Sequence, residues 1–152
     1  MKQFSVIAAL LFLSAPLLAQ NSNPKYDSLL AKQYAGDDYG MKKYILVILK
    51  TGTNKAAEKA FSDSCFAGHM ANIHRLVEMG KLVVAGPLGK NENTYRGIFI
   101  LNAASIEEAQ ELLQTDPAIK ENLLATDVYN WYGSAALPAY LDESDKIWKV
   151  SP

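Results

Sequence analysis

The sequence predicts an α+β fold, a four-stranded antiparallel sheet with both helices on one of its faces. Apolar runs typical of strands occur at 41–52, 82–88, 95–102 and 126–133. Apolar residues with helical spacing lie between the first and second runs, and again between the third and fourth. The resulting order is strand, helix, strand, strand, helix, strand, which is that of a split βαβ arrangement.

The first strand and the first helix have the clearest patterns. Residues Tyr44 to Leu49 form a nearly continuous apolar run, which is typical of a central strand covered on both sides. Between 54 and 80 the apolar residues instead repeat at steps of three and four, which predicts a helix. Gly80 fits the C-terminal cap of that helix.

The second half of the domain contains two strands and a second helical region. The turn sequence GKNENT joins the second and third strands. Ser105 and Glu108 form a capping box, which predicts a helix from there through Leu113. After a break at Asp116-Pro117, a short helix to about residue 124 leads into the fourth strand.

The N-terminal segment predicts export. Lys2 precedes an uncharged, mostly apolar run to Leu18, and Ala19 then gives a small residue before a polar stretch. This is the layout of a cleaved secretory signal over 1–19, and the run is short for a membrane span. We therefore expect a periplasmic or secreted protein without membrane attachment after cleavage, with a polar leader over 20–40 and a short helix near 26–34.

The remaining chain is expected to form one domain, 41–134, and a tail, 135–152, whose Tyr140 and Trp148 need a surface to pack on. The formal net charge is −1, which argues against nucleic acid or anionic membrane as a partner. The single cysteine, Cys65, cannot close an internal disulfide, so buried apolar surface must stabilise the domain.

A histidine lies on the apolar face of the first predicted helix. With Phe66 set at 0° and about 100° per residue, the apolar positions cluster around 340°. They are Phe66, Met70, Ile73, Val77 and Gly80. His69 falls at about 300°, inside this arc, and His74 at about 80°, on its edge. We therefore expect His69 to be buried or to line a pocket, and His74 to contact water.

The residue pattern leaves two roles open for His69 and for Asp116. His69 is either a core histidine hydrogen-bonded to backbone carbonyls or a general base, because imidazole titrates near neutral pH. Asp116 before Pro117 is a good helix N-cap, which alone explains it. Both roles of Asp116 are compatible, because one carboxylate oxygen can cap the helix while the other accepts from an imidazole.

Several motifs in order resemble the YCII-related (YciI-like) family. They are His69 followed by Gly80, the segment KLVVAGP, Gly97 in the third strand, SIEEAQELL and Thr115-Asp116-Pro117. The resemblance covers about residues 42–133 and implies a ferredoxin-like fold that pairs into a dimeric α+β barrel. It also implies a histidine–aspartate pair, carried here by His69 and Asp116, and proton-transfer chemistry on small ring compounds. Relatives include a dehydrochlorinase of a chlorinated aromatic diol, whereas most of the family has no settled activity.

Other residues offer weaker candidates. Arg96 could bind an anionic substrate or be a solvated strand residue, and Tyr44 is one of several strand aromatics that could wall a pocket for a flat ligand. Cys65, one turn before His69, could belong to a nucleophilic or metal site, but a free buried cysteine is the commoner case. The segment AGPLGK lacks the spacing of a phosphate loop. We expect neither a metal nor a cofactor.

Three functions follow from this sequence. The first is an exported homodimeric enzyme of isomerase or lyase type, in which His69 is the general base or acid, Asp116 orients it, and Arg96 and Tyr44 contact a small cyclic substrate. The second is a small-molecule-binding module without catalysis. The third is a purely structural dimer. We expect a dimer because the sheet face away from the helices would otherwise be bare.

Overall fold

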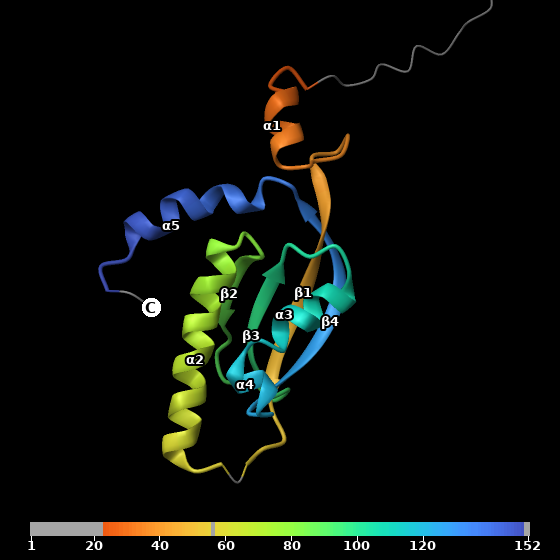
Figure 1. Cartoon of the computed structure of the whole chain (residues 1–152). Helices are drawn as coiled ribbons and strands as arrows, with labels where there is room; N and C mark the ends of the chain where they lie inside the picture. The colour runs from red at the N-terminus through yellow and green to blue at the C-terminus, as the bar shows by residue number, and fades with distance from the viewer. Residues whose placement is uncertain (1–22, 56, 151–152) are drawn as a thin grey trace, which may run out of the picture.

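The computed structural model of the chain describes residues 23–55 and 57–150, so the predicted signal sequence lies outside the described residues. The α+β fold is confirmed, with a four-stranded antiparallel sheet of order β2-β3-β1-β4. In chain order the elements are α1 (Ser28–Gln33), β1 (Met41–Thr51), α2 (Lys59–Glu78), β2 (Leu82–Pro87), β3 (Tyr95–Leu101), α3 (Ile106–Leu113), α4 (Pro117–Lys120), β4 (Leu124–Ser134), η1 (Leu137–Tyr140) and α5 (Leu141–Ile147). Figure 1 shows their arrangement.

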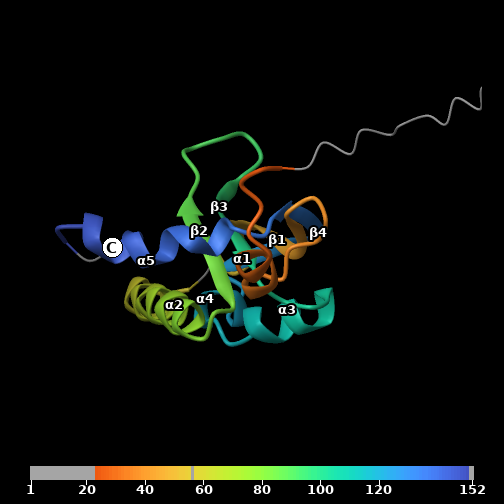
Figure 2. The ribbon, with the colours of Figure 1, turned by 90° about the horizontal axis from the view of Figure 1, so that it is seen from above.

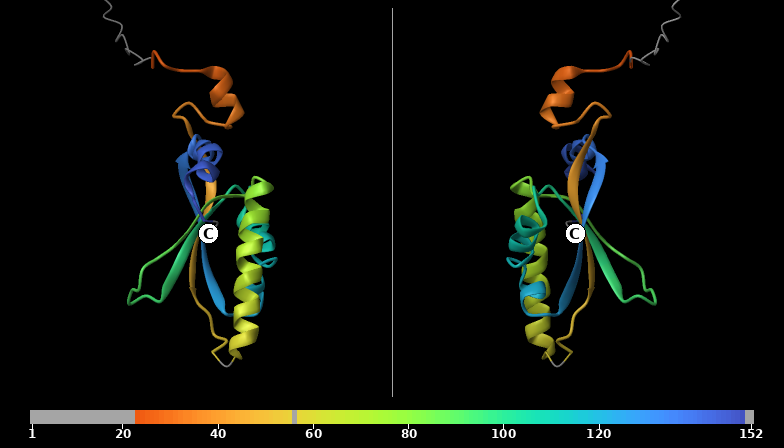
Figure 3. Two further views of the ribbon diagram at one scale, coloured as in Figure 1. Left: turned by 90° about the vertical axis from the view of Figure 1, so that its left-hand side faces the viewer. Right: turned by 90° about the vertical axis from the view of Figure 1, so that its right-hand side faces the viewer.

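Helices α2, α3 and α4 cover one face of the sheet (Figure 3). The main core lies between them and alternate residues of the strands, such as Ile45 and Val47 of β1 and Phe99 and Leu101 of β3. β1 is central, as its apolar run predicts, and β4 pairs along its whole length, from Met41 opposite Ser134 to Thr51 opposite Leu124.

The buried face of α2 differs from the one predicted. Its buried residues are Cys65, Asn72 and Leu76, which centre about 80° away from the predicted apolar arc. Hydrophobicity misplaced the arc because one of these three buried positions is an asparagine, whose burial depends on hydrogen bonds. The predicted C-terminal cap is confirmed: Gly80 has φ +65°, and its N–H donates to Val77 O at 2.8 Å.

The other face of the sheet is only partly covered. Tyr44, Val83 and Ile100 are buried there, with Leu46, Val84, Trp131 and Leu137 of η1 packed against them. Farther along β4, Tyr129 lies on this face and remains 50% exposed. The described part of this face therefore has apolar and aromatic surface but no covering helix layer comparable to α2, α3 and α4.

The leader and the tail both contact the sheet. The Tyr132 hydroxyl donates to the Asp37 carboxylate, which connects the leader to β4. The Tyr140 hydroxyl donates to the backbone oxygen of Val83, so Tyr140 packs on β2, as expected of a tail residue that needs a surface. Trp148, in contrast, stays 46% exposed. None of the helices within 23–55 and 57–150 combines the length and apolar character of a membrane span.

Candidate functional site

A cavity of about 410 Å³ lies between α2 and the β2–β3 part of the sheet. Its lining is mostly apolar and includes Phe66, His69, Met70, Ile73, Ala85, Gly97 and Phe99. At Gly97 the backbones of β2 and β3 approach closely, because a Cβ built there would lie 2.8 Å from the backbone oxygen of Gly86. Three residues of the predicted apolar arc, Phe66, Met70 and Ile73, thus line this cavity, while Phe66, Ile73 and Val77 also pack against the main core.

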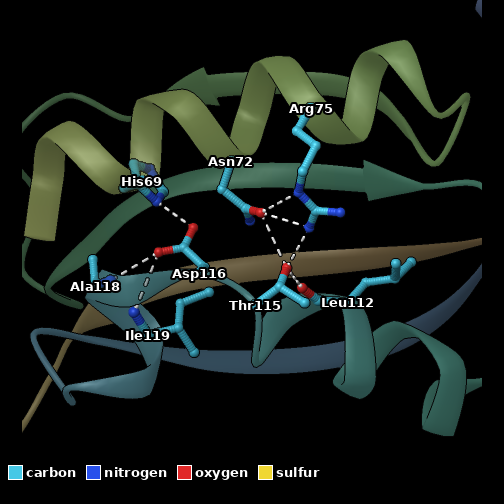
Figure 4. A network of polar contacts seen from close by, with 8 residues as sticks. All are labelled: His69, Asn72, Arg75, Leu112, Thr115, Asp116, Ala118 and Ile119. Carbon is cyan, nitrogen blue, oxygen red and sulfur yellow. Dashed lines mark hydrogen bonds and ion pairs between the residues drawn. The ribbon is translucent and has the colours of Figure 1, made fainter.

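His69 and Asp116 meet at the inner side of this cavity. His69 Nδ1 lies 2.6 Å from Asp116 Oδ2, and the two side chains are 12% and 1% exposed (Figure 4). His69 lines the cavity, which is one of the two places expected for it, and the two residues are direct neighbours although 47 positions separate them. His74 is exposed, as its place on the helix predicts.

The Asp116 carboxylate performs both of its proposed structural tasks at once. Its Oδ1 accepts hydrogen bonds from the N–H groups of Ala118 at 2.9 Å and Ile119 at 3.4 Å, which caps α4. Its Oδ2 faces the imidazole. A carboxylate only accepts hydrogen bonds, so His69 Nδ1 must donate to it. The buried charge is compensated by these donors, and the imidazole is fixed in one orientation.

A close approach of two helices makes this contact possible. A Cβ built on Gly68 of α2 would lie 2.7 Å from Cγ of Pro117, the first residue of α4. Any larger residue at 68 would push α4 away and would carry Asp116 with it. Gly68 was not predicted from the sequence, although a glycine inside a helix directly before the key histidine is a recognisable signal.

A second set of hydrogen bonds holds the segment before Asp116 against α2 (Figure 4). The buried Asn72 Oδ1 accepts from Arg75 Nη2 at 2.7 Å and lies 3.0 Å from Thr115 Oγ1. Arg75 Nη2 also donates to Thr115 Oγ1 at 2.7 Å. Asn72 follows His69 by three residues and so shares its helix face. This network, also missed, fixes the residue next to Asp116 and supports the position of the carboxylate.

Two aromatic rings fix the plane of the imidazole. Phe99 stacks on it with ring centroids 5.9 Å apart, and Phe66 meets it edge-on at 6.3 Å. Nδ1 has the only hydrogen bond of this ring to a described residue. Nε2 is consequently the nitrogen with which His69 can meet a ligand in the cavity.

The profile of the YCII-related domain matches residues 45–132, more than half of the 152-residue chain. The chain belongs to the YCII-related domain family. A solved structure that it resembles is the 5-chloro-2-hydroxyhydroquinone dehydrochlorinase of Burkholderia phenoliruptrix AC1100 in complex with 2,5-dihydroxybenzoquinone. The two are 23% identical with a TM-score of 0.42, and the match covers 57% of this chain and 92% of that one. No curated protein sequence matches the chain.

Within this YCII-related domain, Tyr44 does not take the place predicted for it. It alternates with Ile45 along β1 and points to the face away from α2, where its hydroxyl donates to Ser134 O at 3.0 Å. The expected contact of Tyr44 with a substrate in the His69 cavity is therefore wrong. The apolar run of β1 supplies both faces of the sheet, so hydrophobicity could not assign Tyr44 to one of them.

Arg96 and Cys65 are also placed by the structure. Arg96 borders the cavity, but it is exposed and alternates with Gly97, which faces α2, so its substrate contact remains a prediction. Cys65 is buried in the main core, as expected of a free cysteine. Residues 23–55 and 57–150 contain no group of three or more His, Cys, Asp or Glu side chains suited to a metal ion.

Proposed function

We propose that this YCII-related domain is an enzyme that transfers protons on a small cyclic molecule without a cofactor, as an isomerase or a lyase. His69 is the general base and acid, and Asp116 orients it. The observation that supports this proposal is the 2.6 Å contact between His69 Nδ1 and the buried Asp116 at the edge of an apolar cavity.

The proposed chemistry follows from the hydrogen position. With Nδ1–H donating to Asp116, the neutral ring carries its lone pair on Nε2. Nε2 removes a proton from a substrate carbon next to a carbonyl group, and the C–H electron pair enters the conjugated system. Return of the proton at another carbon completes an isomerisation, whereas departure of a leaving group with its electron pair completes an elimination. The Asp116 carboxylate stabilises the imidazolium between these steps.

Export and dimer formation belong to the same proposal. The signal-like layout of residues 1–19 supports a periplasmic or secreted location. The partly covered sheet face, with Tyr129 half exposed, supports association with a second copy of the chain.

A non-catalytic binding module is the competing function. One observation favours it: apart from His69 and His74, the cavity lining contains no group that titrates near neutral pH. In that case His69 would only orient a ligand, and its replacement would change affinity and no rate.

The deciding experiment is a turnover assay with named probes. Isomerisation of 3-cyclohexen-1-one is followed by the absorbance of the conjugated product, and elimination from chlorinated cyclohexanones by chloride release. His69→Gln should lower an observed rate by about 10²–10⁴-fold. Leu113→Ala is the control, because Leu113 is buried in the core outside the cavity and its loss affects stability alone. Unchanged turnover in His69→Gln would exclude the proposed role.

A further inference from the structure

A second cavity of about 410 Å³ lies between α2 and the C-terminal tail. Tyr140 and Trp148 line it from the tail side, and Tyr140 is hydrogen-bonded to Val83 O of β2. Figures 1 and 2 show α5 crossing near the C-terminal end of α2, beside β2. The residues that match the YCII-related domain end at 132, so the tail that forms this cavity is an addition to that domain.

This tail cavity adjoins the His69 cavity. Ile73, His74 and Ala85 line both. Ala85 pairs with Phe99 in the sheet, and Phe99 stacks on the imidazole of His69. A ligand with its ring beside His69 can therefore extend past Ala85 into the tail cavity.

The charges around the tail cavity select one class of ligand group. Its lining contains two carboxylates, Glu78 and Asp145, and no lysine or arginine. Neither carboxylate forms an ion pair with the described residues. Asp145 accepts a hydrogen bond from Trp148 Nε1 at 3.4 Å, which keeps the indole beside a carboxylate. The carboxylates attract an ammonium group through Coulomb interactions, and the face of the nearby indole can add a cation–π interaction.

We propose that the tail cavity is a second ligand subsite, which binds an ammonium group on an apolar arm. The ligand class is an arylalkylamine, with its ring in the His69 cavity and its ammonium group among Trp148, Glu78 and Asp145. As a statement about the substrate, this inference rests on the function proposed above. The binding itself does not require chemistry at His69.

The test uses three probes with one carbon skeleton: 4-phenylbutylammonium, 4-phenylbutan-1-ol and 4-phenylbutyrate. Calorimetric titration of the full chain at low salt should show the ammonium probe binding about ten-fold tighter than the alcohol, and the carboxylate weakest. Glu78→Gln and Asp145→Asn should each lower the ammonium affinity about three-fold and leave the alcohol unaffected. Trp148→Leu should lower it about two- to five-fold. Asp142→Asn is the matched control, since Asp142 lies on the same helix but outside the cavity, and it should change nothing.

Equal affinity for the three probes, or a charge preference that survives the double replacement of Glu78 and Asp145, would overturn the subsite. His69→Gln separates the two proposals. If it leaves turnover unchanged while the ammonium preference persists, the proposed catalytic function fails and the subsite stands. If His69→Gln abolishes turnover, and the natural protein shows no preference for the ammonium probe, the subsite fails and the catalytic function stands.

Discussion

Replacement of Asp116 by alanine or by asparagine should separate the structural and chemical roles of this carboxylate. Alanine removes the cap of α4, which typically costs about 1 kcal/mol. It also leaves the largely buried His69 Nδ1–H without a partner, which adds roughly 1–3 kcal/mol. The free energy of unfolding should therefore fall by about 2–4 kcal/mol.

Asparagine retains an oxygen for the N–H groups of Ala118 and Ile119, and its amide nitrogen takes the place of Oδ2. The cost should be under about 1.5 kcal/mol, because an ordinary hydrogen bond replaces a charge-assisted one. However, an amide that donates to Nδ1 moves the ring hydrogen to Nε2 and removes the catalytic lone pair. Asp116→Asn should therefore stay folded and lose turnover.

Urea unfolding of the three proteins, followed by circular dichroism at one pH, measures both costs. If the free energy of unfolding of the alanine variant lay within about 0.5 kcal/mol of that of the natural protein, the reasoning would be refuted. Loss of the helix cap and of the imidazole's hydrogen-bond partner should together cost more than that. An asparagine variant as unstable as the alanine variant would refute the separation of roles.

Three other perturbations test the surrounding structure. Gly68→Ala places a Cβ against Pro117, which typically costs roughly 1–3 kcal/mol and outweighs or cancels the gain of about 1 kcal/mol in helix propensity; a variant more stable in urea by that full gain would contradict the close approach. The hydrogen bond to Asp37 raises the pKa of Tyr132 to about 12, so its contribution to stability is complete below pH 10 and is lost as the pH rises through about 12. Ultraviolet titration should show one phenol with that midpoint, and Asp37→Asn should lower it; an unmoved midpoint would rule out Asp37 as the cause. Tyr129→Glu should shift sedimentation from dimer to monomer, and a monomeric natural protein would contradict the expected dimer.

Much of the fold could be predicted because local signals agree with tertiary structure. Ser105 Oγ accepts a hydrogen bond from the N–H of Glu108 and caps α3, Gly80 ends α2 with a positive φ, and the strands follow their apolar runs. In contrast, the prediction that His69 and Asp116 are neighbours depended on the family resemblance. Residues 47 positions apart show no local sequence pattern that indicates a contact between them.

The rest of the site depends on contacts that the sequence does not encode locally. The burial of Asn72 is explained by its partners Arg75, on the same helix, and Thr115, in the turn between α3 and α4. Gly68 matters only because Pro117 lies against it. The side of the sheet to which Tyr44 points depends on the register of a strand that is apolar throughout.

The hydrogen position on His69 is the most direct test of a general base oriented by Asp116. Nitrogen-15 spectra of the imidazole, recorded at a pH where the ring is neutral, distinguish a protonated from an unprotonated ring nitrogen. The geometry predicts hydrogen on Nδ1 and a free lone pair on Nε2, with the pattern reversed in Asp116→Asn. Hydrogen on Nε2 in the natural protein would contradict the proposed base.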